Sequence, residues 1–465
     1  MDGLFKGVVR RLPLAEAVLR LLKFVCNEEF LQIVFQRYRG RAYEKVISFT
    51  LFVQLIADAL VEFHGSGRKS FQRAAAQEDL QATARAVYGK LSRVPLALSL
   101  GLLAESTKRL TEIFPASLAG AAIPRSLQGM ELLVHDGKKI KHVAKRLKAL
   151  RKVRGHVLGG KLVVTLSLNT GMAVAAAADA DGEVSDTPLL PGLLDQVRRW
   201  VPGPRLHVAD RLFCDLDQPG LFTNDPNDHF LVRWNRRVHF HRDPSQPVHS
   251  GFDDAQRMYK EDWGWIGQPN DPRRRRVRRI TLKRARQEDV VLLTDLTQRE
   301  QYPAGDLLTV YLARWGIERM FQQVTEVFQL KTLIGGTPQA TVFQAVFCFL
   351  LYNMIQVMRA YVAEGQKLKV PEISSENLFY DTQRQLIGWN MLLRPADTVR
   401  LLETTWTAAQ VARRLRELLH GQWTESWRKA PRKKPTPHPE REYLEGGHTS
   451  VYRLLNKAKK RRHPN

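Results

Sequence analysis

The chain has 465 residues and is 44% hydrophobic, enough to build two or three globular units with cores of their own. Its 72 Lys and Arg outnumber 47 Asp and Glu, and the net charge of +25 predicts a polyanionic partner, because self-repulsion of this size needs compensation. Nucleic acid is the leading candidate; a ribosomal or solubility-related charge excess and an anionic membrane surface are the alternatives. Three distant cysteines argue against a disulfide framework and a structural zinc site and fit a reducing compartment, and the N-terminal sequence lacks the order of a secretory signal.

Helical patterns fill the first 125 residues. Apolar residues recur at helical spacing over 43–63, the Gly65–Gly67 breaker follows, and Ser70 is placed to cap the next helix. From residue 131 the pattern changes. The stretch ELLVHDGKKI predicts a short strand that ends in Asp136.

Two further strands are predicted around the turn at Asn169–Gly171, followed by a helix over 187–200. The run RLHVAD, residues 205–210, then predicts another strand, and it again ends in a carboxylate, Asp210. Strand, hairpin, helix and strand in this order indicate a mixed α/β sheet. Three more strand candidates within 228–296 indicate a β-rich segment.

Helical periodicity returns from about residue 305 and runs again through 338–362 and after 390. No charge occurs between Thr332 and Met358, but GGTP interrupts the start and polar amides interrupt the rest, so a buried helix is favoured over a membrane span. The Pro-rich, basic stretch 428–442 predicts disorder. Removing 428–465 is therefore expected to leave the thermal melt of the core nearly unchanged.

Three carboxylates stand where a reaction could use them. Asp136 and Asp210 each end a predicted strand, and strand ends line the ligand crevice of open α/β sheets. Glu318 follows 108 residues after Asp210, on a predicted helix. On that helix Tyr311, Arg314 and Glu318 fall within about 60° of one another, at the rim of the apolar stripe. An ordinary i,i+4 pair between Arg314 and Glu318 is the bland alternative.

Phosphodiester chemistry gives these residue types a purpose. Carboxylates from separate elements are the hard oxygen ligands that Mg²⁺ prefers, and two such ions can serve both the attacking and the leaving oxygen. The Arg314 guanidinium can hold a phosphate through two parallel hydrogen bonds, and the Tyr311 hydroxyl can donate to another phosphate oxygen.

The sequence YLARWGIERMF, residues 311–321, resembles the Y-(2)-R-(3)-E signature of transposases of the type named after insertion sequence 4. VHDGKKI and HVADRLFCD are similar to the motifs around that family's first two aspartates, and the likeness covers roughly 130–360. It implies an α/β fold with a ribonuclease-H-like mixed-sheet core, a β-rich insertion, an N-terminal helical domain and a basic C-terminal tail.

The same resemblance implies that Asp136, Asp210 and Glu318 are catalytic and bind Mg²⁺, with Mn²⁺ as a possible substitute, while Tyr311 and Arg314 contact DNA. Expected partners are double-stranded DNA, as element ends and target, and a second copy in a synaptic homodimer. The implied reaction is cleavage at the element ends followed by joining of the 3′-hydroxyls to target DNA, in the bacterial cytoplasm at the nucleoid. The alternative is a catalytically silent DNA-binding protein derived from a transposase.

One position departs from the family pattern, which continues with Lys seven residues after the glutamate. Here that position is Thr325, so the phosphate contact of the Lys is in doubt.

Two basic stretches add candidate DNA contacts. Arg273, Arg274, Arg275 and Arg276 open the densest run, DPRRRRVRRITLKRAR, which predicts a β-ribbon along phosphates or a solvated charged hairpin. Lys138 and Lys139 open a second run directly after Asp136, either a phosphate grip or a surface loop. Trp234, Trp263 and Trp265 lie near the first run; core packing is the interpretation, and stacking on an unpaired base the alternative.

The resulting domain organisation is a helical, DNA-binding N-terminal domain over 1–125, the first part of the catalytic core over 126–227, a β-rich insertion over 228–300, the last part of the core over 301–365, a helical region over 366–427 and a basic, partly disordered tail over 428–465.

Overall fold

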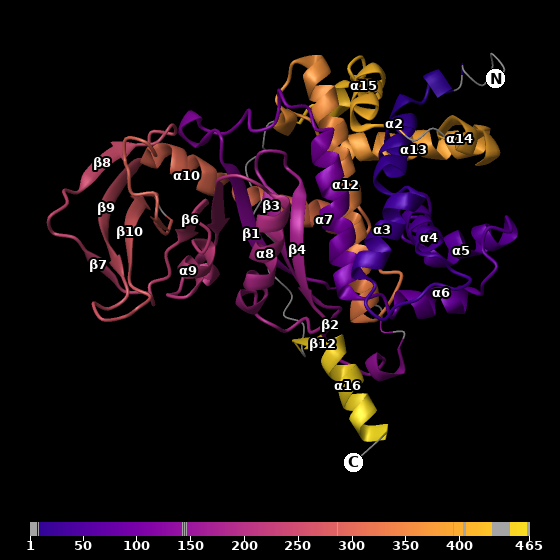
Figure 1. Cartoon of the computed structure of the whole chain (residues 1–465), viewed down its shortest axis with the longest axis horizontal. Coiled ribbons are helices and arrows are strands. Elements are labelled where there is room, and N and C mark those ends of the chain that lie inside the picture. Colours follow the sequence, from indigo (N-terminus) through magenta and orange to yellow (C-terminus); the bar gives the residue numbers. More distant parts are fainter. Residues whose placement is uncertain are drawn as a thin grey trace.

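Ten strands of this protein form one long mixed sheet, flanked by helices (Figure 1). The computed structural model describes residues 7–462 apart from 8, 142, 144, 146, 286, 394, 403–405 and 430–446. The strand order in the sheet is β4-β3-β1-β5-β6-β11-β10-β9-β7, with β8 paired to β9. Its strands are β1 (Glu131–Lys139), β3 (Lys161–Ser167), β4 (Ala173–Asp179), β5 (Arg205–Ala209), β6 (Asp228–Arg233), β7 (Phe240–Arg242), β8 (His249–Phe252), β9 (Met258–Ile266), β10 (Arg275–Leu282) and β11 (Val290–Thr294).

The centre of the sheet is parallel and both its ends are antiparallel. β5 runs parallel to β1 on one side and to β6 on the other, whereas β3 is antiparallel to β1 and β4 to β3. The predicted hairpin is confirmed: Gly171 takes φ +73 in the turn, and the Asn169 side chain ties the turn to β1 by accepting a hydrogen bond from the backbone N–H of Leu132 (2.9 Å). A side-chain anchor of this kind holds the hairpin beside the central strand.

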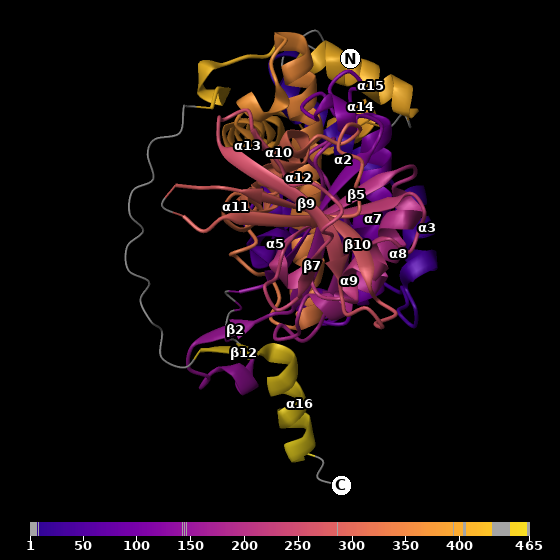
Figure 2. The ribbon, with the colours of Figure 1, turned by 90° about the vertical axis from the view of Figure 1, so that its left-hand side faces the viewer.

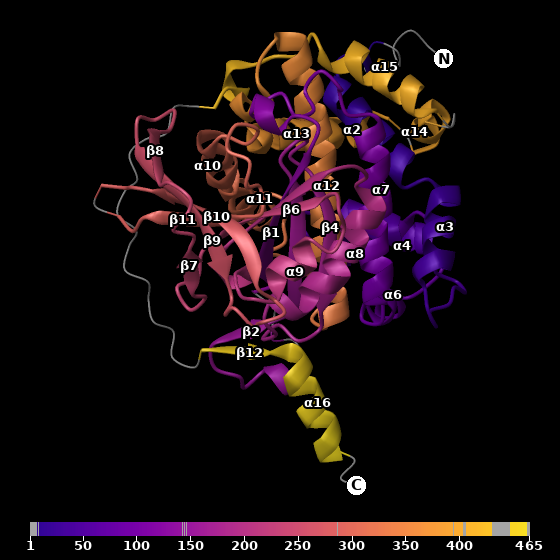
Figure 3. The same cartoon turned by 60° about the vertical axis from the view of Figure 1, so that its left-hand side comes forward.

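Helices cover both faces of the central strands. The alternation along β1 sends Leu132 and Val134 into the core shared with α7 (Leu96–Glu112), α10 (Ala304–Ala313), α11 (Trp315–Glu326) and α12 (Pro338–Gln366). Leu133 points the other way, toward α8 (Leu190–Trp200) and α9 (Gln218–Phe222). Figure 3 shows α8 and α9 on one side of these strands. The sheet is therefore buried on both faces at its parallel centre.

The β-rich segment is continuous with this sheet. Its first strand, β6, pairs with β5, and β11 pairs with β6. The strands predicted from HFLVRWN, RVRRITL and DVVLLTDL are confirmed as β6, β10 and β11. Hydrogen bonding therefore runs without a gap across residue 228, and the division of the chain at that residue stays a prediction about domains.

The remaining helices surround α12 or lie at the N-terminal side. They are α2 (Pro13–Val25), α3 (Glu28–Tyr38), α4 (Phe49–Val61), α5 (Gly67–Ala76), α6 (Ala84–Leu91), α13 (Ser375–Leu392), α14 (Pro395–Leu402) and α15 (Ala408–Leu419). The expected cap at Ser70 is wrong: Ser66 caps α5, and the Ser70 hydroxyl donates to the backbone oxygen of Leu55 (2.8 Å). The breaker ends one residue earlier than expected, so the helix starts earlier.

α12 is long and apolar enough to cross a membrane, and its most apolar window is entirely buried inside the protein. Its amides are used inside the fold: Asn353 Nδ2 donates to Thr107 Oγ1 (2.9 Å), and Gln344 Nε2 donates to the Thr332 carbonyl (2.9 Å). Burial against α7 and its neighbours accounts for the uncharged sequence, as predicted.

The C-terminal segment docks, contrary to the expectation that it leaves the core's stability untouched. β12 (His448–Ser450) pairs in parallel with β2 (His156–Leu158), and α16 (Val451–Arg462) follows. Ser450 and Val451 are fully buried, so this end of the chain contributes to the packed structure. Figure 2 shows α16 pointing away from the body. Residues 430–442 of the Pro-rich stretch 428–442 lie outside the described residues, so its disorder stays a prediction.

Candidate active site

Asp136 lies inside β1, not at the end of the strand as the sequence predicted. The parallel pairing of β1 with β5 ends at His135↔Ala209, but the antiparallel pairing with β3 continues to Lys139↔Lys161. Asp136 therefore stands where β5 leaves the sheet while its own strand goes on. β1 remains a strand beyond His135 because its pairing with β3 continues.

Asp210 is the residue that directly follows the end of β5. It follows Ala209, and its Oδ1 accepts a hydrogen bond from the N–H of Leu212 (2.8 Å) at the start of the short helix η4 (Arg211–Phe213). Since His135 pairs with Ala209, the next residues on the two strands are Asp136 and Asp210. The period of two directs both toward the sheet face that carries α10 and α11.

The helix that carries Tyr311, Arg314 and Glu318 is interrupted, whereas the sequence predicted one continuous helix. α10 ends at Ala313 and α11 begins at Trp315. Around Arg314 the bonds tighten to i→i+3: its N–H donates to the Tyr311 carbonyl (3.1 Å), and its own carbonyl accepts from Ile317 (3.0 Å). A mid-helix turn of this type places Arg314 at a bend.

The Arg314 guanidinium lies between two carboxylates. Its Nη2 is 3.0 Å from Glu318 Oε1, and its Nη1 is 3.9 Å from Asp136 Oδ2. The side chain is mostly buried, and its Nε has no hydrogen-bond partner. The i,i+4 pair is thus real, but the arginine also reaches the sheet. The unpaired N–H is a donor suited to an oxygen anion.

Burial raises the pKa of Asp136 to about 6. The Gly137 N–H and Arg314 act in the opposite direction, and the nearby charges of Asp210 and Glu318 raise the pKa further. The three predicted carboxylates therefore repel one another electrostatically. Burial also raises the pKa of the Tyr311 hydroxyl.

The donor set fits a divalent cation by its chemistry. Asp136 on β1 lies within electrostatic range of Asp210, which follows β5, and of Glu318 on α11, and a doubly charged ion would relieve this repulsion. Among the residues that the structure describes, no three His, Cys, Asp or Glu side chains lie close enough to hold a metal ion as they stand. Arg314 supplies the positive charge between Asp136 and Glu318 instead.

Lys138 extends this site along β1, on the same face as Asp136. Its Nζ lies 3.4 Å from the Phe321 carbonyl of α11 and 5.4 Å from the centre of the Phe321 ring. The Thr325 hydroxyl donates to the same carbonyl (2.7 Å). Burial lowers the pKa of Lys138, as does Lys141, while Glu326 and Asp136 raise it. Lys139 is exposed on the other side of the strand.

The arginines of the densest basic run already have partners. These are Asp271 and Asp217 for Arg273, the Trp265 ring for Arg274, the Thr223 hydroxyl for Arg275 and Asp243 for Arg276. The interpretation that Arg278 follows phosphates is wrong, because it is fully buried in an ion pair with Glu261. β10 lies between β9 and β11, so half of its side chains face the interior.

The aromatic residues near this run mainly pack, as predicted. Trp263 is buried and its Nε1 donates to the Thr297 carbonyl (3.0 Å), and Trp234 Nε1 donates to Val238 (2.9 Å). Two apolar side chains beside the carboxylates were missed: Trp315 is 57% exposed and Leu212 is 45% exposed. Their places directly after Arg314 and two residues after Asp210 were the only signal.

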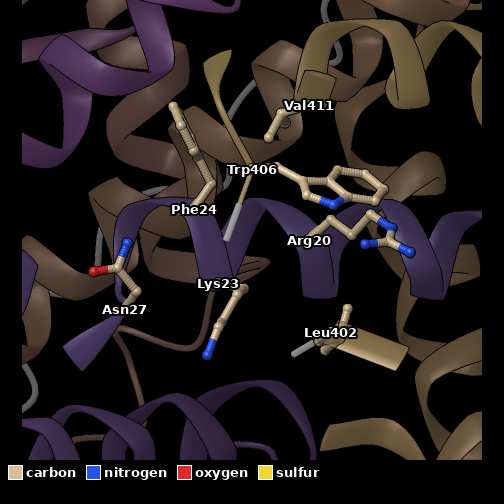
Figure 4. Close-up of a pocket in the computed structure, with 7 residues that line it drawn as sticks. All are labelled: Arg20, Lys23, Phe24, Asn27, Leu402, Trp406 and Val411. Atoms are coloured by element: carbon tan, nitrogen blue, oxygen red, sulfur yellow. The ribbon is translucent and has the colours of Figure 1, made fainter. Parts of the chain in front are cut away.

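A small hollow lies between α2, α14 and α15, apart from these carboxylates (Figure 4). Trp406 stacks there under the Arg20 guanidinium, 3.8 Å from the ring centre. Burial lowers the pKa of Arg20, and its partner Glu16 raises it. The arginine is thus already engaged by a ring and a carboxylate, and none of the residues predicted for the site lines this hollow.

Comparison with known proteins was informative for the central part of the chain. Residues 127–354 match the family described as the transposase DDE domain. The match supports a DDE transposase. No curated protein matches the chain. The cryo-EM structure of a piggyBac transposase synaptic complex with hairpin DNA is similar at 10% identity and a TM-score of 0.41, over 92% of this chain and 88% of that chain, a likeness too low to carry an argument.

Proposed function

We propose that this transposase binds the ends of its insertion sequence, cleaves DNA by metal-dependent phosphodiester hydrolysis and joins the 3′-hydroxyl ends to target DNA. The observation that carries the proposal is the position of Asp136 and Asp210, each directly after the last residue pair of β1 and β5, His135↔Ala209, with Arg314 linking Asp136 to Glu318. The matched segment, 127–354, contains all four residues.

The strand order supports a ribonuclease-H-like core of the insertion-sequence-4 type. β1, β3 and β4 form an antiparallel meander, and β5 and β6 extend it in parallel on the other side of β1. The β-rich insertion then lies between Asp210 and Glu318 in sequence, as the resemblance implies.

Asp136, Asp210 and Glu318 would hold Mg²⁺, with Mn²⁺ as a substitute, which supplies charge neutralisation at the phosphate and an activated oxygen nucleophile. Arg314 contributes its unpaired Nε–H and, once its carboxylates have another counter-charge, a guanidinium fork for a phosphate oxygen. Tyr311 lies beside it, with the arginine carbon 5.8 Å from the ring centre, and donates a further hydrogen bond. The half-buried position of these groups limits water around the phosphate.

DNA contacts would extend from this centre. Lys138 presents an ammonium that makes no ion pair among the described residues, and Lys139 and Arg273–Arg276 are the further proposed contacts. Arg273 and Arg276 would have to exchange acidic partners for phosphates, so their share is expected to be smaller. A homodimer that brings two element ends together in a synaptic complex, at the nucleoid of a bacterial cytoplasm, completes the proposal.

The second candidate is a catalytically silent DNA-binding protein. Thr325 favours it, because its hydroxyl is used within α11 and offers no charge to a phosphate. Strand cleavage on a terminal-end substrate, with and without Mg²⁺ or Mn²⁺, separates the two. Metal-dependent cuts at the element ends support the enzyme, and DNA binding without cuts supports the silent protein. Terminal inverted repeats beside the reading frame would identify the substrate.

A further inference from the structure

Two segments far apart in sequence form a surface that has many cations and no acidic residue of its own. Residues 138–158 contain nine Lys and Arg, and 447–462 contain six, and neither contains Asp or Glu. The parallel pairing of β12 with β2 and the packing of α16 against η2 (Lys148–Leu150) bring them together. We call these two segments the basic arm.

The basic arm is held by a specific set of contacts. Ser450 is buried, its N–H donates to Glu183 Oε1 (2.6 Å), and its hydroxyl accepts from the N–H of Gly182 (3.3 Å). Arg453 Nε is 2.7 Å from Asp181 Oδ2, and the same guanidinium pairs with Glu183. Asp181 and Glu183 thus neutralise one arginine and anchor the segment.

Apart from Lys138, most of the other described cations of the arm face solvent. Lys141, Lys148, Lys152 and Lys457 are exposed and make no ion pair among the described residues. In both Figure 1 and Figure 3 α16 projects from the body next to β2. This differs from the run at 273–284, in which Asp217, Asp243, Glu261, Asp262 and Asp289 form ion pairs with five of the eight cations.

We propose that the basic arm binds the phosphate backbone of double-stranded DNA that flanks the candidate active site. This inference rests on the proposed function, since it extends that DNA contact to a surface assembled only when the C-terminus docks. The arm begins on β1, two residues after Asp136, so DNA at the carboxylates has a short path to it. A row of exposed ammonium and guanidinium groups without local carboxylates matches a row of phosphates.

An anionic membrane fits the arm less well. A helix that lies on a membrane presents an apolar face to the lipid. The leucines of α16, Leu454 and Leu455, are packed against the protein instead. Binding to the backbone of duplex DNA needs only exposed positive charges spread along a surface, and the basic arm has these.

The first experiment measures how DNA affinity depends on salt in the full-length protein. Lys141→Gln, Lys148→Gln, Lys152→Gln and Lys457→Gln, combined, should lower the slope of log affinity against log salt by about three to four units on any duplex. The control carries the same change at four exposed lysines elsewhere, Lys45, Lys260, Lys367 and Lys369, and should lose less than one unit. Equal loss in both proteins, or no loss in either, overturns the proposal.

The second experiment separates the docked arm from a diffuse positive charge. Asp181→Asn with Glu183→Gln raises the net charge by two, yet it releases Arg453 and the anchor of Ser450. We expect duplex binding at least about threefold weaker than wild type, because the arm cations lose their fixed arrangement. Binding that is unchanged or tighter overturns the proposal. Circular dichroism and the thermal melt of the core check that each variant is folded.

The outcomes also separate this inference from the proposed function. If wild type cuts element ends but the arm variants bind like wild type, only the arm proposal fails. If wild type binds no duplex at all, the proposed function fails with it. A third measurement uses vesicles that contain anionic lipid. If the wild-type protein binds these vesicles more tightly than duplex DNA at equal salt, the assignment of DNA as the partner is overturned.

Discussion

The two faces of the β1–β5 strand pair carry titratable side chains in adjacent positions, and they differ in how well the charges are matched. His135 and His207 point to the α8 side, where His135 Nε2 lies 2.9 Å from His207 Nδ1. Asp136 and Asp210 point to the α11 side. One residue along β1 thus separates the histidine network from the carboxylate cluster.

On the histidine face the buried carboxylate has cationic partners. His207 Nε2 lies 3.2 Å from Asp228, whose carboxylate also binds Arg205 and Arg198. Burial alone would raise the pKa of Asp228, but these three partners hold it well below its usual range. Burial lowers the pKa of both histidines, so the neutral rings are favoured.

The carboxylate face has three negative groups and one arginine. Burial and mutual repulsion raise the pKa of Asp136, the opposite of the result for Asp228. A buried charge that the fold leaves uncompensated costs stability, and such sites recur where a ligand supplies the missing charge. An excess of negative charge, more than the residue types, therefore distinguishes the candidate site from the core.

The largest expected effect is the loss of DNA cleavage when one carboxylate on the α11 face is removed. Asp210→Asn removes one of the three carboxylates and should reduce Mg²⁺-dependent cleavage at least about 1,000-fold, equivalent to roughly 4 kcal/mol. Cleavage of a terminal-end substrate measures it, with duplex affinity and thermal melt as controls that should stay near wild type. Retained cleavage would reject the role of Asp210.

On the histidine face the expected loss is in folding. Asp228→Asn removes the fully buried charge partner of the Arg205 guanidinium and should lower the free energy of unfolding by about 3–5 kcal/mol. The matched control is Asp225→Asn, which removes a partly exposed partner of the same arginine and should cost at most about 1 kcal/mol. Equal losses in denaturant titrations would contradict the contrast between matched and unmatched charges.

Asp136→Asn should stabilise the metal-free protein, whereas Asp228→Asn should destabilise it. With its pKa raised to about 6, Asp136 keeps its proton in the folded protein at pH values where the unfolded chain releases it. Metal-free stability therefore falls as pH rises from about 4 to about 6 and stays lower above that. At pH 8 without metal, Asp136→Asn should raise the free energy of unfolding by up to about 3 kcal/mol while cleavage is lost. A destabilised variant would show that its charge is compensated.

Metal affinity should follow the same titration. Because Asp136 must lose its proton to bind Mg²⁺, affinity should fall roughly tenfold per pH unit below about 6 and level off above it. Calorimetric titration of wild type with Mg²⁺ between pH 5 and pH 8, with Asp210→Asn as the control, measures this. Affinity that is flat across pH 6 would place the metal away from Asp136.

The smallest expected effect concerns Lys138 and Thr325, which meet at the Phe321 carbonyl. Lys138→Met should weaken binding to element ends by about 1 kcal/mol and lower the salt slope by about one unit. Adding Thr325→Lys should restore both, since it returns a cation to the same place, and Thr325→Lys alone should exceed wild type by similar amounts. No rescue would mean that the two positions do not share a phosphate. Cleavage by none of these proteins, with DNA binding intact, would favour the silent alternative.

Local pattern was enough to predict much of the core sheet. Short apolar runs placed β1, β3 to β6, β10 and β11, and the Asn169–Gly171 turn placed the hairpin, because these features depend on neighbouring residues. The same alternation directs His135 and Asp136 to opposite faces of β1, so the sequence alone distinguishes the two faces. The catalytic roles of Asp136, Asp210 and Glu318 remain predictions.

Other features depended on residues far away in sequence. The length of β1 beyond Asp136 is set by β3, and the bend at Arg314 appears only in the folded chain. The sequence suggested that the arginines at 273–276 were free to bind phosphates. In the folded chain, Arg273 pairs with Asp217, next to α9, and Arg276 pairs with Asp243, next to β7. Charge density in sequence does not reveal which carboxylates will lie next to it.

The amino-acid sequence by itself determined the alternation that directs Asp136 and Asp210 to one face, the helix that carries Glu318 and the excess of positive charge. Tertiary structure alone decided which charges find partners: Asp228 gains three, Asp136 only a distant arginine, and Arg453 reaches Asp181 from the other end of the chain. The physical reason is range. Side-chain direction and helix formation are set within a few residues, whereas desolvation and charge pairing depend on whatever the fold brings within a few ångströms.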